Sequence, residues 1–158
     1  MSIVLARVDE RLVHGQIITS WSKHLRVNNI FIVDDEIARD SFMKEVLSLS
    51  APKGLKFSIL SVEEAVEKIN QEKNSDKSRI MILFKSIKTA LSLVESGCAL
   101  SDLNLGNIGS SPSRKKISKN ISMDEEEVEA AKKLIDLGVD VYLQMIYTEN
   151  KIPVEKVI

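Results

Sequence analysis

Several residue types are scarce in this sequence, and each shortage excludes a class of protein. A single cysteine, Cys98, cannot form an internal disulfide, and together with only two histidines it does not make a zinc site. No apolar run approaches the roughly 20 residues of a membrane span, and Arg7 and Asp9 stand where a signal peptide would have its apolar region. We therefore expect a cytoplasmic protein with no disulfide and no metal.

An excess of charge of one sign is also missing. The chain has 22 lysines and arginines against 23 aspartates and glutamates, so its overall field gives no reason to expect binding to nucleic acid or to an anionic membrane surface. What the chain does have is apolar content: 44% of its 158 residues are hydrophobic, enough to bury one good core. Because there is no internal repeat and no linker, we expect a single domain over residues 1–158.

Strand-like and helix-like segments alternate along the chain. Short apolar runs predict strands at 3–6, 29–33, 55–60, 80–84, 102–105 and 139–145. Apolar residues at helical spacing predict helices at 17–25, at 37–49, from 61 to a polar loop at 70–78, at 90–97 and at 124–137. This alternation predicts the α/β class, a three-layer, open, mostly parallel sheet with helices on both faces. In such sheets ligands bind beyond the carboxyl ends of the strands.

The candidate site is the segment at 7–16, between the first strand and the first helix. It reads Arg-Val-Asp-Glu-Arg-Leu-Val-His-Gly-Gln. His14 stands where a loop leaving a strand enters a helix, and there unpaired N–H groups and the positive end of the helix dipole favour an anion. Gly15 lets the backbone come close to a ligand. This position therefore suits a phosphate.

Two arginines lie close to this histidine in the sequence. Arg7 and Arg11 can each bind phosphoryl oxygens bidentately, and Asp9 between them could orient an arginine or hold the imidazole in one tautomer. The pattern predicts a nucleophilic histidine that accepts a phosphoryl group. A lone histidine in a soluble chain is also commonly a surface or structural residue, and the residues alone leave that alternative open.

The segment at 7–16 resembles the active-site loop of the IIB components of the mannose/fructose/sorbose family of the sugar phosphotransferase system. The likeness covers nearly the whole chain, and four further motifs follow the family pattern: Val33-Asp34-Asp35, Ala51-Pro52-Lys53-Gly54, Phe84-Lys85-Ser86 and Leu103-Asn104-Leu105-Gly106. The loop motif is the specific part. The resemblance implies the strand order 3-2-4-1-5-6, which the alternation by itself does not.

The resemblance also implies a phosphotransferase function. A cognate IIA protein would phosphorylate His14, at Nδ1, and membrane IIC and IID components would present a sugar of the mannose/fructose/sorbose/N-acetylgalactosamine class to take the group. Arg11, Arg7 and Asp9 would be the other catalytic residues, the arginines stabilising charge on the phosphoryl oxygens. Backbone N–H groups would hold the phosphate at Val13, Gly15 and Gln16.

The same resemblance sets expectations for partners and location. Because phosphoryl transfer needs mostly positioning and electrostatics, no cofactor and no metal are expected. The protein would be cytoplasmic and would associate peripherally with a membrane permease. A homo-oligomer is left open.

Three alternatives stay open. A regulatory module could use the same anion pocket to sense phosphate or a phosphorylated partner without passing the group on. The basic connection at 106–122 is either a solvated loop with a short strand or a docking surface. The pair Asp34-Asp35 either caps the next helix or turns a carboxylate toward the active-site loop. The chain departs from the family pattern at Asn107–Ser110, at Ile87 and at Met145–Thr148.

Overall fold

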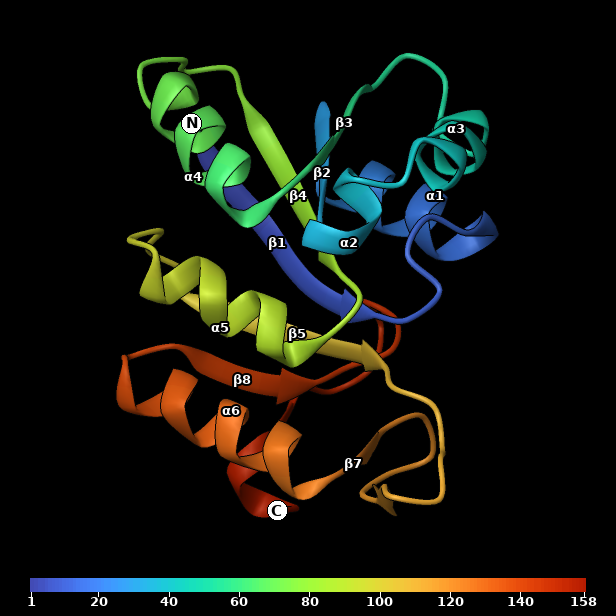
Figure 1. Ribbon diagram of the computed structural model, residues 1–158, viewed down its shortest axis with the longest axis vertical. Helices are drawn as coiled ribbons and strands as arrows, with labels where there is room; N and C mark the ends of the chain where they lie inside the picture. Colours follow the sequence, from blue (N-terminus) through green and yellow to red (C-terminus); the bar gives the residue numbers. More distant parts are fainter.

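The computed structural model describes residues 1–158 apart from the side chains of Gln16 and Ile17. Its central sheet has parallel strands, which are β1 (Ser2–Asp9), β2 (Asn29–Val33), β3 (Lys56–Leu60), β4 (Arg79–Phe84), β5 (Asp102–Asn107) and β8 (Asp140–Leu143). They lie in the order β3-β2-β4-β1-β5-β8, and the short β9 (Ile152–Pro153) pairs antiparallel with β8 at the edge. The predicted strand order is therefore confirmed, with β8 as the sixth strand (Figure 1).

Helices cover both faces of the sheet, which gives the predicted three layers (Figure 1). One face carries α1 (Gly15–His24), α2 (Asp35–Ala38) and α3 (Ser41–Leu49). The other carries α4 (Val62–Glu72), α5 (Ile87–Glu95) and α6 (Glu125–Asp136), and the chain ends in the short 3-10 helix η1 (Val154–Lys156). Within the described chain, no helix has both the length and the apolar character to cross a membrane.

Strand β2 explains why the core has two halves. Its residues Ile30, Phe31, Ile32 and Val33 are all fully buried, as expected for a central strand of a parallel sheet. Phe31 and Val33 pack with the α4–α6 layer, whereas Ile30 and Ile32 pack with the α1–α3 layer. Burial of each such side chain contributes roughly 1.5–3 kcal/mol, so this strand alone is a large part of the core.

Strand β1 is longer than predicted. The apolar run indicated residues 3–6, but the strand continues through Asp9 because residues 7–9 stay paired with β4 and β5, and Arg7 and Asp9 form an ion pair there. Because side chains alternate between the two faces of a strand, Leu5 and Arg7 both point toward the α1 layer. Arg7 lies against the ring of Trp21 of α1. Ala6 and Val8 point to the opposite layer. The polar end of β1 thus lies on the same side as α1.

Two other predictions need correction or detail. The single helix predicted at 37–49 is wrong, because Asp40 accepts a hydrogen bond from Met43 N at 3.1 Å and so begins a second helix after α2 has ended. The connection at 106–122 contains β6 (Lys115–Lys116), which pairs antiparallel with β7 (Ser122–Met123), and we call residues 114–123 the basic hairpin. Helix α4 begins after Ser61 as predicted, with both hydrogen bonds of the capping box to Glu64.

Candidate active site

The candidate site lies where the order of the strands reverses. From β1 the chain crosses to β2 on one side, and from β4 it crosses over β1 to β5 on the other. The carboxyl ends of β1 and β4 therefore border the crevice in which sheets of this kind bind ligands. Arg7 and Asp9 lie at this end of β1, and Arg11 and His14 lie in the loop that follows.

Asp9 holds both predicted arginines. One of its carboxylate oxygens, Oδ2, accepts from Arg7 Nη2 at 3.1 Å and from Arg11 Nη2 at 3.0 Å. The other, Oδ1, accepts from Arg11 Nε and from the Arg11 backbone N–H, both at 3.0 Å. Asp9 is 1% exposed, so these charge-assisted bonds act with little screening by water. The carboxylate thereby sets the orientation of the Arg11 guanidinium group.

The two arginines differ sharply in exposure. The Arg7 side chain is 1% exposed, whereas that of Arg11 is 37% exposed. Burial lowers the pKa of the Arg7 guanidinium, and the Asp9 carboxylate offsets part of that shift. The structure therefore places Arg7 behind Asp9 as an internal support, and Arg11 in front where an anion can reach it.

Arg7 is enclosed by residues that are distant in sequence. Its Nη1 donates to Asn104 Oδ1 at 2.6 Å and to the Gln144 carbonyl oxygen at 3.1 Å. Its Cζ lies 5.5 Å from the centre of the Trp21 ring, a cation–π distance. A Cβ atom at Gly106 would lie 2.1 Å from Arg7 Cζ, so only glycine leaves room for the guanidinium group there.

His14 is the N-cap residue of α1 and is half-buried. Its Nδ1 lies 3.2 Å from the Leu12 carbonyl oxygen, which can only accept, so the contact assigns the ring proton to Nδ1 in this conformation. Its Nε2 is buried and has no hydrogen-bond partner within the described part of the chain. Since a buried unpaired nitrogen costs free energy, the ring gains by finding a new partner.

The loop around His14 is anchored by its apolar residues. Leu12 and Val13 are buried in the same cluster as Trp21, and the Leu12 N–H donates to the Asp9 carbonyl oxygen at 2.9 Å. Gly15 follows with a φ of 31° and is exposed. The first turn of α1 contains no acidic residue, so the positive end of its dipole is not neutralised locally. Gln16 has a described backbone, but its side chain lies outside the described atoms.

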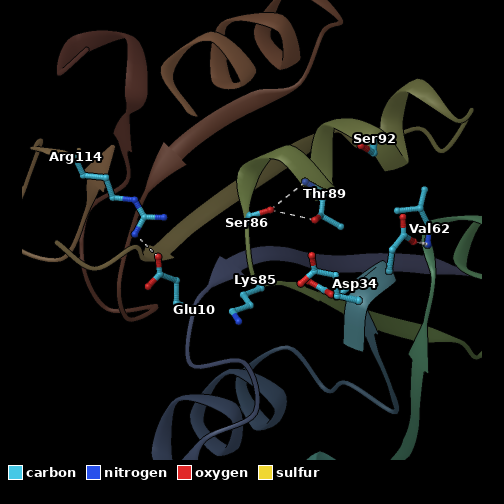
Figure 2. Close-up of a pocket in the computed structure, with 10 residues that line it drawn as sticks. Glu10, Asp34, Val62, Lys85, Ser86, Thr89, Ser92 and Arg114 are labelled. Atoms are coloured by element: carbon cyan, nitrogen blue, oxygen red, sulfur yellow. Dashed lines mark hydrogen bonds and ion pairs between the residues drawn. The ribbon is translucent and has the colours of Figure 1, made fainter. Parts of the chain in front are cut away.

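A cleft of about 490 Å³ opens beside this loop, between the ends of β1, β2 and β4 (Figure 2). Asp34 caps α2 by accepting from Ile37 N at 2.9 Å, and Asp35 accepts from Val62 N at 2.8 Å at the start of α4. Both aspartates also line the cleft, together with Lys85 at the end of β4. Asp34 thus fulfils the capping alternative, whereas Asp35 bonds the start of α4 instead of the next helix. His14 is not among the residues that line this cleft.

The basic hairpin is joined to the loop through Arg114. Its guanidinium group pairs with Glu10 (Figure 2). It also donates to Glu127 Oε1 at 2.7 Å and to the Gly109 carbonyl oxygen at 2.9 Å. Burial works against its charge, but the bonds to Glu127 and Glu10 outweigh it and raise the pKa of Arg114. Arg114 is therefore occupied within the molecule, whereas Lys115 and Lys116 are exposed.

Asn104, Gly106, Gln144 and Trp21 all belong to the site, but sequence reasoning gave none of them a role in it. Asn104 and Gly106 appeared only as part of a family pattern, and Trp21 is one of the apolar residues of the helix predicted at 17–25. One signal was present: Asn104 interrupts an apolar strand between Leu103 and Leu105, and it is 0% exposed in the structure. A polar residue inside a buried strand requires a partner, which here is Arg7.

The fold and the site together define an α/β protein with a histidine and an oriented arginine near the N-terminus of a helix. A family model described as "PTS system sorbose subfamily IIB component" matches residues 3–158. The chain belongs to this family of phosphotransferase-system IIB components, so the resemblance drawn from the loop motif is confirmed.

Individual relatives agree with this assignment. The sorbose-specific EIIB component of Lacticaseibacillus casei is 36% identical over 149 residues, which cover 94% of this chain and 90% of that protein. The mannose-specific EIIAB component of Escherichia coli (strain K12) is 33% identical over 96% of this chain but only 47% of its own length.

Solved structures agree as well. The crystal structure of the IIBSor domain of the sorbose permease from Klebsiella pneumoniae has a TM-score of 0.91 at 31% identity and covers 99% of this chain and 95% of that one. The crystal structure of manxB from Thermoanaerobacter tengcongensis has a TM-score of 0.89 at 39% identity, with 99% and 94% covered.

Proposed function

We propose that this protein is a phosphohistidine carrier that passes a phosphoryl group from a IIA protein to an incoming sugar by way of His14. The observation that carries the proposal is the pairing of a histidine at the N-terminus of α1 with an arginine that Asp9 holds in a fixed orientation. The names of the relatives, which include sorbose-, mannose-, fructose- and N-acetylgalactosamine-specific components, support this sugar class.

The first transfer takes the group from the donor to His14. A lone pair on a neutral His14 ring nitrogen attacks the phosphorus of a phosphohistidine on IIA, and the new N–P bond forms as the donor N–P bond breaks. The electron pair of the broken bond returns to the donor imidazole. In the second transfer a sugar hydroxyl oxygen attacks the phosphorus as the bond to His14 breaks. The electron pair of that bond returns to the His14 ring, and the proton lost by the hydroxyl group is balanced by the proton that the released imidazole takes up. Both steps need in-line positioning and charge stabilisation rather than a cofactor.

Each residue of the predicted set has a distinct part in this proposal. Arg11 faces solvent and would bind the phosphoryl oxygens with its planar fork. Asp9 would hold Arg11, and Arg7 would hold Asp9 from behind. Backbone N–H groups at the start of α1 would bind the phosphate, namely those of Val13, Gly15 and Gln16.

The family resemblance assigns the transfer to Nδ1, and this requires a movement. Nδ1 now carries the proton that contacts the Leu12 carbonyl oxygen at 3.2 Å, so its lone pair is not available to the donor. The ring must turn away from Leu12, and the proton must move from Nδ1 to Nε2, before Nδ1 can attack.

The proposed partners are a IIA protein, which donates the group, and membrane IIC and IID components, which present the sugar. The protein would work in the cytoplasm and associate peripherally with the permease. The exposed Lys115, Lys116 and Lys119 of the basic hairpin would be available to contact an acidic partner. Arg114 would instead hold the hairpin in place through Glu10.

The test is phosphoryl transfer with purified components. Incubation with labelled phosphoenolpyruvate, the general phosphotransferase proteins and a cognate IIA should label the wild type and the His24→Ala variant but not His14→Ala. Because these are the chain's two histidines, the pair of variants locates the label. Labelled protein should then discharge to membranes that contain the permease when sugar is added. Equal labelling of His14→Ala would refute the carrier, and a stable label with no discharge would indicate a sensor.

A further inference from the structure

A polar segment that follows β8 contacts both flanks of the active-site loop. We define it as the brace, residues 144–149. In Figure 1 the red chain after β8 passes the arrowhead of β1. The Gln144 carbonyl oxygen accepts from Arg7 Nη1 at 3.1 Å and from Asn104 Nδ2 at 2.9 Å. The brace therefore holds the strand that leads into the loop.

The brace also holds the helix that leaves the loop. The Met145 carbonyl oxygen accepts from Trp21 Nε1 at 3.3 Å. The Tyr147 ring stacks on His24 with centroids 4.0 Å apart and planes 9° from parallel, and it meets Trp21 edge-on at 6.0 Å. Trp21 and His24 both lie on α1, so the brace spans from the end of β1 to α1 and bridges the loop that carries His14.

Internal hydrogen bonds stiffen the brace. The buried Gln144 side chain donates from Nε2 to the Glu149 carbonyl oxygen at 2.7 Å, and the Met145 N–H donates to Glu149 Oε2 at 3.2 Å. From outside, Asn120 Nδ2 contacts Met145 Sδ at 3.0 Å. Because the brace contacts both β1 and α1 and is hydrogen-bonded within itself, it can hold these two elements at a fixed distance from each other.

We infer that the brace is a positioning element for phosphoryl transfer, and that Tyr147, Trp21 and Gln144 are positioning residues. By fixing α1 relative to the end of β1, the brace sets the distance between His14 at the mouth of α1 and Arg11, which Asp9 and Arg7 orient from β1. Their proposed role is to place His14 and Arg11, not to bind the phosphoryl group. The inference rests on the proposed function, because transfer is the step that the positioning serves.

Tyr147→Ala tests the inference, with two matched variants. Tyr147→Phe keeps the ring, and Ile146→Ala truncates a neighbour that is 40% exposed, against 39% for Tyr147, and lies outside both core clusters. We expect Tyr147→Ala to lower kcat of transfer from phosphorylated IIA on the order of tenfold with an unchanged KM. Both matched variants should transfer at the wild-type rate.

Two signals report on the brace without any transfer. Trp21 is the only tryptophan, so the protein has one indole N–H resonance, and His14 is one of two histidines. Tyr147→Ala should shift the indole signal and the His14 ring signals, whereas Tyr147→Phe and Ile146→Ala should shift neither. These signals stay informative if the wild type proves not to accept phosphate, a result that would refute the proposed function alone.

Three results would overturn the inference. Unchanged His14 ring signals in Tyr147→Ala would mean that the brace does not reach the histidine. A raised KM with an unchanged kcat would mean that Tyr147 contacts the donor protein directly. A lowered melting temperature with unchanged kcat and KM would mean that the brace only stabilises the fold.

Discussion

Asp9 at the end of β1 and Glu10 directly after it each belong to a cluster of ion pairs, and the two clusters have net charges of opposite sign. Asp9 lies between Arg7 and Arg11, so two guanidinium groups share one carboxylate and the cluster has a net charge of +1. Glu10 shares Arg114 with Glu127, so two carboxylates share one guanidinium group and the net charge is −1. The same type of ion pair therefore has different consequences, depending on which charge is in excess.

The two clusters also differ in burial and in what they face. Asp9 is 1% exposed and its cluster lies on the α1 side, next to the loop that carries His14. Glu10 is 30% exposed and its cluster borders the cleft on the α4–α6 side, where it holds the basic hairpin. The excess positive charge thus lies beside the loop that would receive the phosphoryl group under the proposed function, whereas the excess negative charge attaches a surface element.

The largest expected effect comes from removing one charge at the centre of the positive cluster. Asp9→Asn leaves Arg7 buried without a counterion and should destabilise the protein by about 3–5 kcal/mol. The matched variant Glu10→Gln, on the adjacent residue, should cost about 1 kcal/mol or less because its pair is partly exposed. Urea unfolding of both variants measures the difference, and equal losses would contradict the contrast drawn between the clusters.

The next largest effect should come from filling the space beside Gly106, which the Arg7 guanidinium group occupies. Gly106→Ala would place a methyl group 2.1 Å from Arg7 Cζ and should cost about 1–3 kcal/mol as the guanidinium group is displaced. Gly109→Ala is the control, because its nearest atom is Glu10 Oε2 at 3.4 Å, an ordinary contact. Thermal unfolding should separate the two alanine variants. If Gly106→Ala were as stable as Gly109→Ala, the tight enclosure of Arg7 would be refuted.

Arg11→Lys separates charge from geometry in the positive cluster. Lysine keeps the charge but loses the planar fork that contacts both Asp9 oxygens, so transfer from IIA should slow on the order of tenfold. Stability should change by less than about 1 kcal/mol because Arg11 is 37% exposed. Rapid-quench measurement of His14 labelling gives the rate, and a rate equal to wild type would exclude a role for the fork.

The smallest effect concerns the pH dependence of the negative cluster. Burial raises the pKa of Glu127, although Arg114 acts in the opposite direction. The folded protein therefore holds this proton to higher pH than the unfolded chain, whose glutamate pKa is about 4.3. Relative to Glu127→Gln, wild-type stability should fall as the pH rises from about 4.3 through the folded pKa. A difference that grows with pH instead would show that Arg114 dominates.

The parts of the fold that depend on local pattern could be predicted from the sequence. Residues close together in the chain account for the alternation of strands and helices, for the capping box at Ser61 and for the helix start at His14. The break between α2 and α3 was missed because the apolar stripe continues across Asp40, and only the cap bond shows that the helix restarts. The strand order came from the family resemblance.

The role of Arg7 could not be predicted in the same way. The pattern indicated two equivalent arginines, but Arg7 contacts Asn104 and Gln144, which are 97 and 137 residues away. Sequence spacing carries no information about such contacts. Only Arg11, whose bonds to Asp9 span two residues, kept the position that local reasoning suggested.

The α/β class and the place of His14 between a strand and a helix follow from local patterns, because hydrophobic periodicity and helix-start signals act over a few residues. The tertiary structure alone decided which arginine faces solvent and what holds the loop in place. That outcome depends on β1 lying between β4 and β5, which brings Gly106 and the brace against Arg7. Arg7 has its counterion two residues away, but Asn104 and Gln144 reach it only once the strands have assembled.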